Sequence, residues 1–144
     1  MLAVYADERM FTFTGGEPPQ QEALRRRYAR LAIGWNDDRT ERWCNWIVRL
    51  HDDPEPIGAV QATVPIDLGT AWVAWEIAVT RWGRGYATEA ARAMVTWLVD
   101  LGVTRIAASI HPSNAASNEV ARRLGLVVTD VVDDDGEVCW ELLT

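Results

Sequence analysis

Residues 82–88, with the sequence WGRGYAT, combine residue types and spacing that could bind an anion. They join an apolar run at 71–79 to an amphipathic run at 88–101, which predicts a strand, a tight turn and a helix. Two glycines let backbone N–H groups approach a ligand closely, and the helix N-terminus adds unpaired donors and partial positive charge. The turn therefore predicts a phosphate site, with Arg81 and Arg84 as added cations. On these residues alone, a plain strand-to-helix connection with surface arginines is equally compatible.

Two common phosphate-binding motifs fit this turn poorly. A P-loop needs a lysine after its second glycine, and all 14 basic residues of the chain are arginines. A dinucleotide-binding turn needs an acidic residue at the end of the next strand. That strand, expected to end at Ile110, is followed by His111, Pro112, Ser113 and Asn114. The dinucleotide alternative would also require a wholly parallel sheet and a nicotinamide cofactor.

Two segments with a predicted strand between them resemble the GNAT superfamily of acetyl-CoA-dependent N-acetyltransferases, and more narrowly its RimJ/RimL-type branch. They are residues 83–90 (GRGYATEA) and 114–126 (NAASNEVARRLGL). The likeness runs from about Ala3 to the C-terminus, so we expect one domain over residues 1–144. The resemblance implies that the turn binds the pyrophosphate of coenzyme A. The residues it assigns to the coenzyme are Ile77, Ala78, Val79, Arg84, Gly85, Tyr86, Ala87, Thr88, Asn114 and Asn118.

The resemblance also implies a reaction. Acetyl would pass from acetyl-CoA directly to a primary amine, without a metal or a covalent enzyme intermediate. The acceptor could be a protein N-terminus, a polyamine, an antibiotic or another small-molecule amine. Two central parallel strands would splay apart to admit the coenzyme, and the backbone at 77–79 would bind its pantetheine arm. The Val79 N–H would then stabilise the oxyanion.

Glu76 is the first candidate for a catalytic side chain. It interrupts an apolar run, and strand alternation places it on the face opposite Trp75 and Ile77. A carboxylate in that position could act as the general base that removes the amine proton. A solvent-facing or arginine-paired glutamate would give the same pattern, and a chain of water molecules could carry the proton instead.

Ser117 is the second catalytic candidate. Many family members protonate the leaving thiolate with a tyrosine four residues before a closing glycine, and this chain has Ala121 there. Ser117 lies eight residues before Gly125, where the RimJ/RimL pattern has a serine, so it is the alternative donor. Capping of the helix is the competing role. The chain also departs from the pattern at Trp82, where Arg or Gln is common, and at Leu126, where Phe is usual.

Composition limits the partners. The chain has 49% hydrophobic and 24% charged residues, as in globular proteins generally, and no apolar stretch long enough to span a membrane. Without a signal-peptide layout, we expect a cytoplasmic protein that does not bind membranes. The net charge of −7 argues against nucleic-acid binding. Cys44 and Cys139 lack metal-ligand spacing, so we expect reduced, structural thiols and no metal.

The predicted elements form an α+β fold. We expect a mixed, mostly antiparallel sheet with one central parallel pair, and helices on both faces. Helices are expected at 2–9, 20–33, 88–101 and 115–124, and strands at 46–51, 57–65, 71–79, 103–110, 126–132 and 137–143. Residues 52–56 are expected to form a linker between the first two strands.

The first strand of the family does not appear in this pattern, either because it is absent or because the given sequence starts inside the natural chain. That leaves a sheet edge which a second copy could cover, in a homodimer or by a domain swap. The resemblance places the acceptor near the first loops and the second helix, which makes Phe11, Phe13 and Tyr28 substrate-side candidates. A non-catalytic acyl-CoA-binding or oligomerisation domain of the same fold is the alternative to an enzyme.

Overall fold

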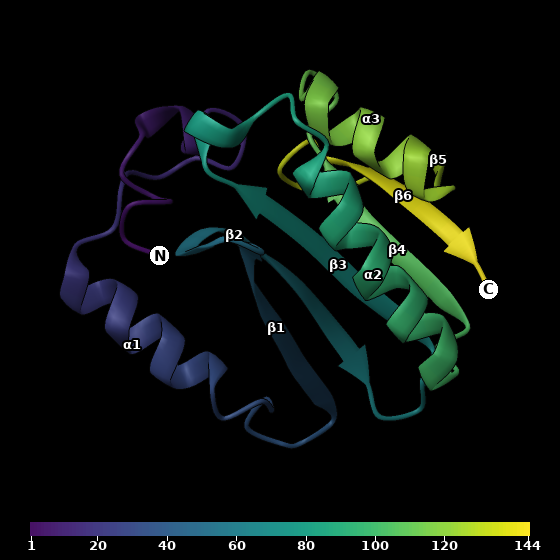
Figure 1. Cartoon of the computed structure of the whole chain (residues 1–144). Coiled ribbons are helices and arrows are strands. Elements are labelled where there is room, and N and C mark those ends of the chain that lie inside the picture. Colours follow the sequence, from purple (N-terminus) through teal and green to yellow (C-terminus); the bar gives the residue numbers. More distant parts are fainter.

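A six-stranded sheet in the order β1-β2-β3-β4-β6-β5 organises the computed structural model, which describes residues 1–144 (Figure 1). Only β3 and β4 are parallel to one another, and every other neighbouring pair is antiparallel. This confirms the predicted mixed sheet, and no strand precedes Glu41. The elements are η1 (Glu8–Phe11), α1 (Gln21–Leu31), β1 (Glu41–Leu50), β2 (Asp53–Pro65), β3 (Thr70–Ile77), η2 (Val79–Arg81), α2 (Tyr86–Leu101), β4 (Arg105–Ile110), α3 (Ala115–Leu124), β5 (Val127–Val132) and β6 (Val138–Leu143).

The parallel pair separates along its length. β3 and β4 pair only where Thr70, Ala71 and Trp72 meet residues 105–107. Farther on, β3 stays paired with β2 as far as Ile77, and β4 stays paired with β6 as far as Ile110. The two strands therefore have no ladder between them over their second halves, and a gap opens in the middle of the sheet.

Helix signals in the sequence mark the ends of α2 and α3. Gly102 and Gly125 follow the two helices with φ angles of 96° and 89°, in the left-handed region that glycine adopts without a Cβ clash. At the start of α3 the Asn114 side chain accepts a hydrogen bond from the N–H of Ser117. Local capping thus sets the bounds of both helices near those predicted.

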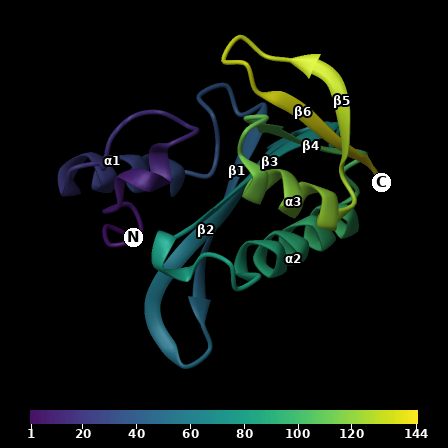
Figure 2. The same cartoon turned by 90° about the horizontal axis from the view of Figure 1, so that it is seen from above.

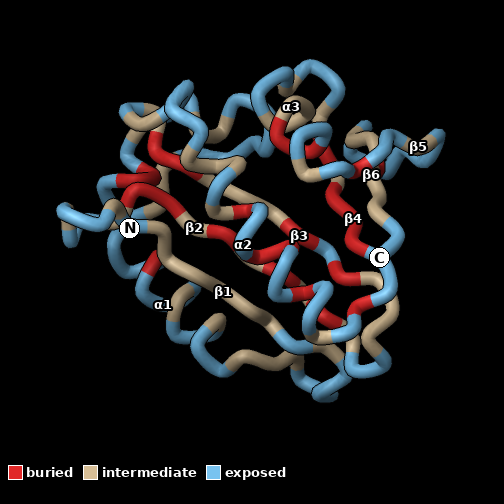
Figure 3. Tube along the Cα trace, turned by 45° about the vertical axis from the view of Figure 1, so that its right-hand side comes forward, coloured by how far each residue is buried: buried red, intermediate tan, exposed pale blue.

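The hydrophobic core lies on one side of the sheet. Helices α2 and α3 cover that side, whereas α1 and the N-terminal turns lie on the other (Figure 2). The core cluster has 16 buried residues, all within the segment from Val60 to Leu126. Buried residues follow β2, β3 and β4 in Figure 3. On the opposite side α1 buries only Leu24, so that face is covered thinly.

Several segments differ from the predictions. β1 begins at Glu41, five residues before the expected start at Trp46, and β3 ends at Ile77, so that Val79 lies in η2 and not in the expected strand. Residues 2–9 do not form one helix: residues 2–7 make irregular turns that bury Val4 and Tyr5, and only Glu8 and Arg9 are helical, in the short η1. Residues 52–56 are not simply a linker, because β2 begins at Asp53 and pairs with β1 through a register shift near Arg49. In residues 2–9 the contact of Tyr5 with β3 overrides local propensity, and in residues 52–56 the pairing with β1 does so. None of the helices is long and apolar enough to cross a bilayer.

Candidate functional site

The glycine turn presents unpaired backbone donors. Gly83 and Gly85 have φ angles of 71° and 82°, which other residues adopt only with strain. None of the backbone hydrogen bonds outside the helices and strands is donated by an N–H of residues 83–88, and the next N–H, of Glu89, donates to the carbonyl of Gly85 at 3.0 Å. A Cβ added at either glycine would have no atom within 4 Å. Free donors therefore face open space at the positive end of α2, as an anion requires.

Side chains near the turn divide into free and occupied groups. Arg84 is exposed and has no ion-pair partner. Arg81 instead pairs with Asp53 of β2 at 3.3 Å, so it is already engaged and the expectation that it joins Arg84 is not met. The indole Nε1–H of Trp82 donates to the carbonyl oxygen of Ile77 at 2.7 Å. Trp82 thus ties the turn to the end of β3. At position 82 the sequence pattern described above commonly has Arg or Gln.

The end of β3 lies between this turn and the gap in the sheet. Ile77 is the last residue of β3, and the N–H of Ala78 donates to the carbonyl of Ile57 at 2.8 Å. Val79 follows as the first residue of η2. The backbone of residues 77–79 therefore leaves the ladder where β3 and β4 have separated.

The α3 candidates have distinct local roles. Asn114 caps the helix, its Oδ1 accepting from the N–H of Ser117 at 3.2 Å. The Asn118 amide donates to the carbonyl of Pro112 at 3.1 Å. The half-buried Ser117 makes no side-chain hydrogen bond, so its hydroxyl is not used for capping. Ala121 is fully buried, and no hydroxyl replaces the missing tyrosine at that position.

Glu76 lies on the face of the sheet opposite the core, as alternation predicts. Its neighbour Ile77 is buried, and Trp75 packs against the core cluster. Tyr5 donates its hydroxyl proton to Glu76 Oε2 at 2.5 Å, and the hydroxyl of Tyr28 lies 3.5 Å from that of Tyr5. Burial and then the negative charge of Glu76 raise the pKa of Tyr5 far above its usual range, so this phenol remains a proton donor to the carboxylate.

Comparison with known proteins identifies the family. A family model described as an acetyltransferase (GNAT) domain matches residues 1–127. The chain belongs to the GNAT acetyltransferase family. No curated protein matches the sequence.

Solved structures share the fold of this GNAT domain. An acetyltransferase of the GNAT family from Bacillus anthracis has 18% identity and a TM-score of 0.78, covering 99% of this chain and 86% of that one. The aminoglycoside acetyltransferase AAC(6')-Ib in complex with coenzyme A has 22% identity and a TM-score of 0.78, with the same coverage of 99% and 86%. An acetyltransferase from Agrobacterium tumefaciens has 22% identity and a TM-score of 0.75, covering 98% and 84%. At these identities the likeness concerns the fold.

Aromatic residues of the N-terminal segment surround the Glu76 side of the GNAT domain. Phe11 packs on Tyr5 with ring centroids 6.5 Å apart, and Phe13 packs on His111, which follows β4, at 5.4 Å. A hollow of about 410 Å³ lies between residues 13–15 and two acidic residues of the β5–β6 connection, Asp135 and Glu137. The structure therefore brings Phe11 and Tyr28 to the Tyr5–Glu76 pair, whereas Phe13 contacts His111 beyond the end of β4.

Sequence reasoning missed two features of this GNAT domain. Tyr5 was expected on an ordinary short helix, and its contact with Glu76 joins residues 71 positions apart. The arginines of α1 belong to no recognised motif, yet Arg26, Arg27 and Arg30 line a cleft against β1 and β2. No local motif signals either feature, although four arginines within six positions were visible at 25–30.

Proposed function

We propose that this GNAT domain transfers acetyl from acetyl-CoA to a primary amine. The observation that carries the proposal is the set of free N–H donors at residues 83–88, located beside the gap between β3 and β4. A diphosphate matches such donors, and a gap between strands leaves room for an extended arm that pairs with backbone. Membership of an acetyltransferase family supports acetyl as the group that is transferred. A structural relative in complex with coenzyme A supports coenzyme A as the carrier of that group.

The residues present fit coenzyme A. Donors of residues 84–88 and the Arg84 guanidinium would hold the pyrophosphate, because an unpaired cation lies within the turn that carries the free amides. The pantetheine arm would run along Ile77, Ala78 and Val79. Asn114 and Asn118, at the start of α3, would contact the coenzyme directly or through water.

The chemistry requires no covalent enzyme intermediate. The amine nitrogen attacks the thioester carbonyl carbon, so that a C–N bond forms while the C–S bond breaks and sulfur leaves with its electron pair. The Val79 N–H would stabilise the oxyanion that develops on the carbonyl. Glu76 would take the proton that the amine loses. Ser117, whose hydroxyl has no partner in the protein, would give its proton to the departing sulfur and regain one from water.

The proposed branch of the family and the proposed acceptor are inferred from the sequence. Residues 83–90 and Ser117 support the RimJ/RimL-type branch, and the acceptor would be a small-molecule or peptide amine. Residues 34–36 cover the edge of β1 as far as Trp43, and the edge beyond it could accept a strand from a second copy in a homodimer. A non-catalytic acyl-CoA-binding domain is the competing function, which the buried Ala121 favours because it removes the usual thiolate acid.

A paired measurement tests the proposal. Acetyl-CoA is titrated calorimetrically into the protein, and free thiol release is then followed over a panel of amines that includes peptides, polyamines, amino acids and aminoglycosides. The proposal expects saturable binding, and turnover with at least one amine above the rate without amine. Saturable binding with no turnover on any amine would favour the non-catalytic domain. Absence of acetyl-CoA binding would remove the basis for both functions.

A further inference from the structure

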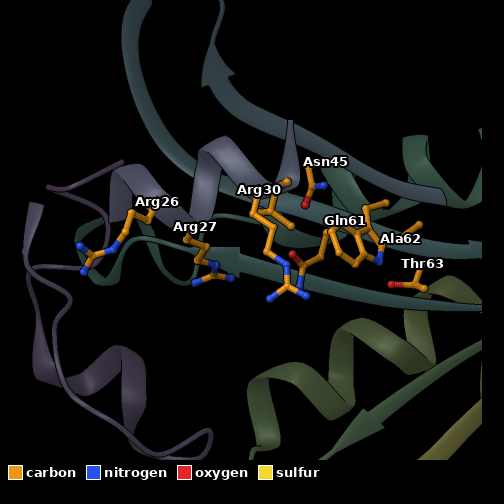
Figure 4. A pocket seen from close by; sticks show the side chains of 9 residues that line it. Arg26, Arg27, Arg30, Asn45, Gln61, Ala62 and Thr63 are labelled. Carbon is orange, nitrogen blue, oxygen red and sulfur yellow. The ribbon is translucent and has the colours of Figure 1, made fainter. Parts of the chain in front are cut away.

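An arginine-lined cleft lies on the same face of the sheet as Glu76. It has a volume of about 540 Å³ and is formed between α1 and the strands β1 and β2 (Figure 4). In Figure 4, Arg27 and Arg30 extend side by side from α1, and Arg30 runs toward Gln61 of β2. The lining residues are Arg26, Arg27, Arg30, Leu31, Trp43, Asn45, Gln61, Ala62 and Thr63.

Two of the arginines are held by aromatic rings and lack acidic partners. The Arg27 guanidinium lies 5.6 Å from the ring centroid of Tyr5, and that of Arg30 lies 5.2 Å from the ring centroid of Trp43. Neither forms a salt bridge or a hydrogen bond within the protein. A ring fixes the plane of a guanidinium and leaves the N–H groups at its edge free, so these donors are oriented before any ligand arrives.

The floor of the cleft adds neutral polar groups. Asn45 and Gln61 face each other across β1 and β2, and Trp43 faces Thr63 in the next same-face pair. None of these polar side chains makes a hydrogen bond to the protein. The cleft thus offers two unpaired cations together with amide and hydroxyl donors, in a protein whose net charge is −7. Carboxylate and phosphate are the ligands that such donors match, and a polyamine would be repelled.

The cleft leads to Glu76. Arg27 lies over the ring of Tyr5, whose hydroxyl donates to the Glu76 carboxylate. Along the sheet, Gln61 pairs with Ala74, and the next pair on the same face is Ala59 with Glu76. A molecule with an amine near Glu76 could therefore place an anionic group among the arginines of α1.

We propose that this cleft binds an anionic oxygen group, carboxylate or phosphate, carried by the amine acceptor. The inference rests on the proposed function and narrows its acceptor to amines that also bear a negative group. Arg27 and Arg30 bind that group while the amine end of the acceptor lies near the Tyr5–Glu76 pair.

Binding is tested without turnover. Inorganic phosphate and acetate are titrated separately into the full chain saturated with acetyl-CoA, while arginine side-chain ¹⁵Nε resonances are recorded. We expect saturable shifts for Arg27 and Arg30 and none for Arg25, which is on the same helix outside the cleft. Equal, non-saturating shifts at all three arginines would show an adventitious ion only and overturn the site.

Turnover then tests whether the acceptor carries the anion. Thiol release is compared for lysine against cadaverine and for phosphoethanolamine against ethanolamine, pairs that differ by one carboxylate or one phosphate. In Arg27→Gln and Arg30→Gln, KM for the anionic member should rise about tenfold, as expected when a hydrogen bond to a charged group is lost. In these two variants, KM for the amine that lacks the carboxylate or phosphate should stay unchanged. In the control Arg25→Gln, KM should stay unchanged for all four amines.

Each outcome has one meaning. Preference for lysine alone identifies a carboxylate, and preference for phosphoethanolamine alone identifies a phosphate. Equal KM values within both pairs, with saturable phosphate binding, would overturn the acceptor assignment. If no amine is acetylated although acetyl-CoA binds, the proposed function itself has failed, and the phosphate titration still decides whether the cleft holds an anion.

Discussion

The hydroxyl of Tyr5 donates a hydrogen bond of 2.5 Å to Oε2 of Glu76, across 71 positions of the chain. The bond attaches the N-terminal turns to the next-to-last residue of β3. It also fixes one oxygen of the carboxylate and leaves the other available on the same face. The Glu76 carboxylate is therefore held in one orientation beside the aromatic rings of Tyr5, Phe11 and Tyr28.

The role of Glu76 as a base predicts the result of Glu76→Gln. Glutamine keeps the size and can still accept from Tyr5, so the fold should persist. The variant should lower kcat for any accepted amine by about 100-fold, the usual contribution of general base catalysis, while the acetyl-CoA Kd stays constant. Glu8→Gln, at an exposed carboxylate of the same segment, is the control and should match the wild type. An unchanged kcat in Glu76→Gln would instead support proton transfer through water.

Tyr5 predicts a loss of stability in alkali. Burial and the charge of Glu76 raise the pKa of the folded-state phenol, whereas the unfolded phenol titrates near its ordinary value of about 10. The folded protein therefore holds the Tyr5 proton more tightly than the unfolded chain does. The stability that this proton contributes is fully present below about pH 10 and is lost as the pH rises above that value. Urea unfolding of wild type and Tyr5→Phe between about pH 8 and 11.5 measures it. The wild type should lose up to about 1.4 kcal/mol per pH unit relative to the variant. Parallel curves would contradict the assignment.

The glycine turn predicts a contrast between two matched substitutions. Gly85 and Gly136 have φ angles of 82° and 80°, and an added Cβ meets no atom within 4 Å at either position. Alanine should cost each about 1 kcal/mol of stability, because the left-handed conformation is strained with a side chain. Only Gly85→Ala should raise the acetyl-CoA Kd, by about tenfold, since its methyl projects beside the free amides. A similar Kd for both variants would place the diphosphate elsewhere.

Close packing at the end of β3 predicts that any side chain at position 58 destabilises the protein. A Cβ there would overlap the carbonyl oxygen of Glu76 and lie 2.7 Å from Ile77 Cδ1. Gly58→Ala should therefore destabilise the protein by about 1 to 3 kcal/mol and weaken acetyl-CoA binding, as β3 is displaced. Thermal unfolding and calorimetry measure the two effects. Gly69→Ala is the control, because its Cβ would meet only the flexible Asp67 carboxylate, at 3.1 Å. Equal melting temperatures for both variants would contradict the argument.

Local signals were enough to predict the part of the molecule expected to bind the coenzyme. Glycines at 102 and 125 end the helices, and apolar periodicity gives α2 and α3 within two residues of their observed bounds. The crossover through α2 predicts the parallel pair β3–β4. These features depend on neighbours in sequence, which is why they could be read before the fold was known.

The opposite face could not be predicted in the same way. Tyr5 is buried through a bond to a strand far along the chain, so residues 2–7 form turns where a helix was expected. Pro54 and Pro56 suggested a linker, but this first part of β2 pairs only with β1, since its ladder with β3 starts at Gly58. Proline is tolerated on a strand segment with one free side. A long-range contact decided the first case, and pairing with the preceding strand decided the second.

The placement of the core cluster on one side of the sheet gives the two halves of the molecule unequal local stability. No residue before Val60 belongs to that cluster, and α1 buries only Leu24. The first forty residues are therefore the segment best able to open transiently while the rest stays folded, and their amides should exchange with solvent fastest. The part of the acceptor surface that α1 supplies could consequently change in sequence during evolution with little effect on the scaffold of α2, α3 and the central strands.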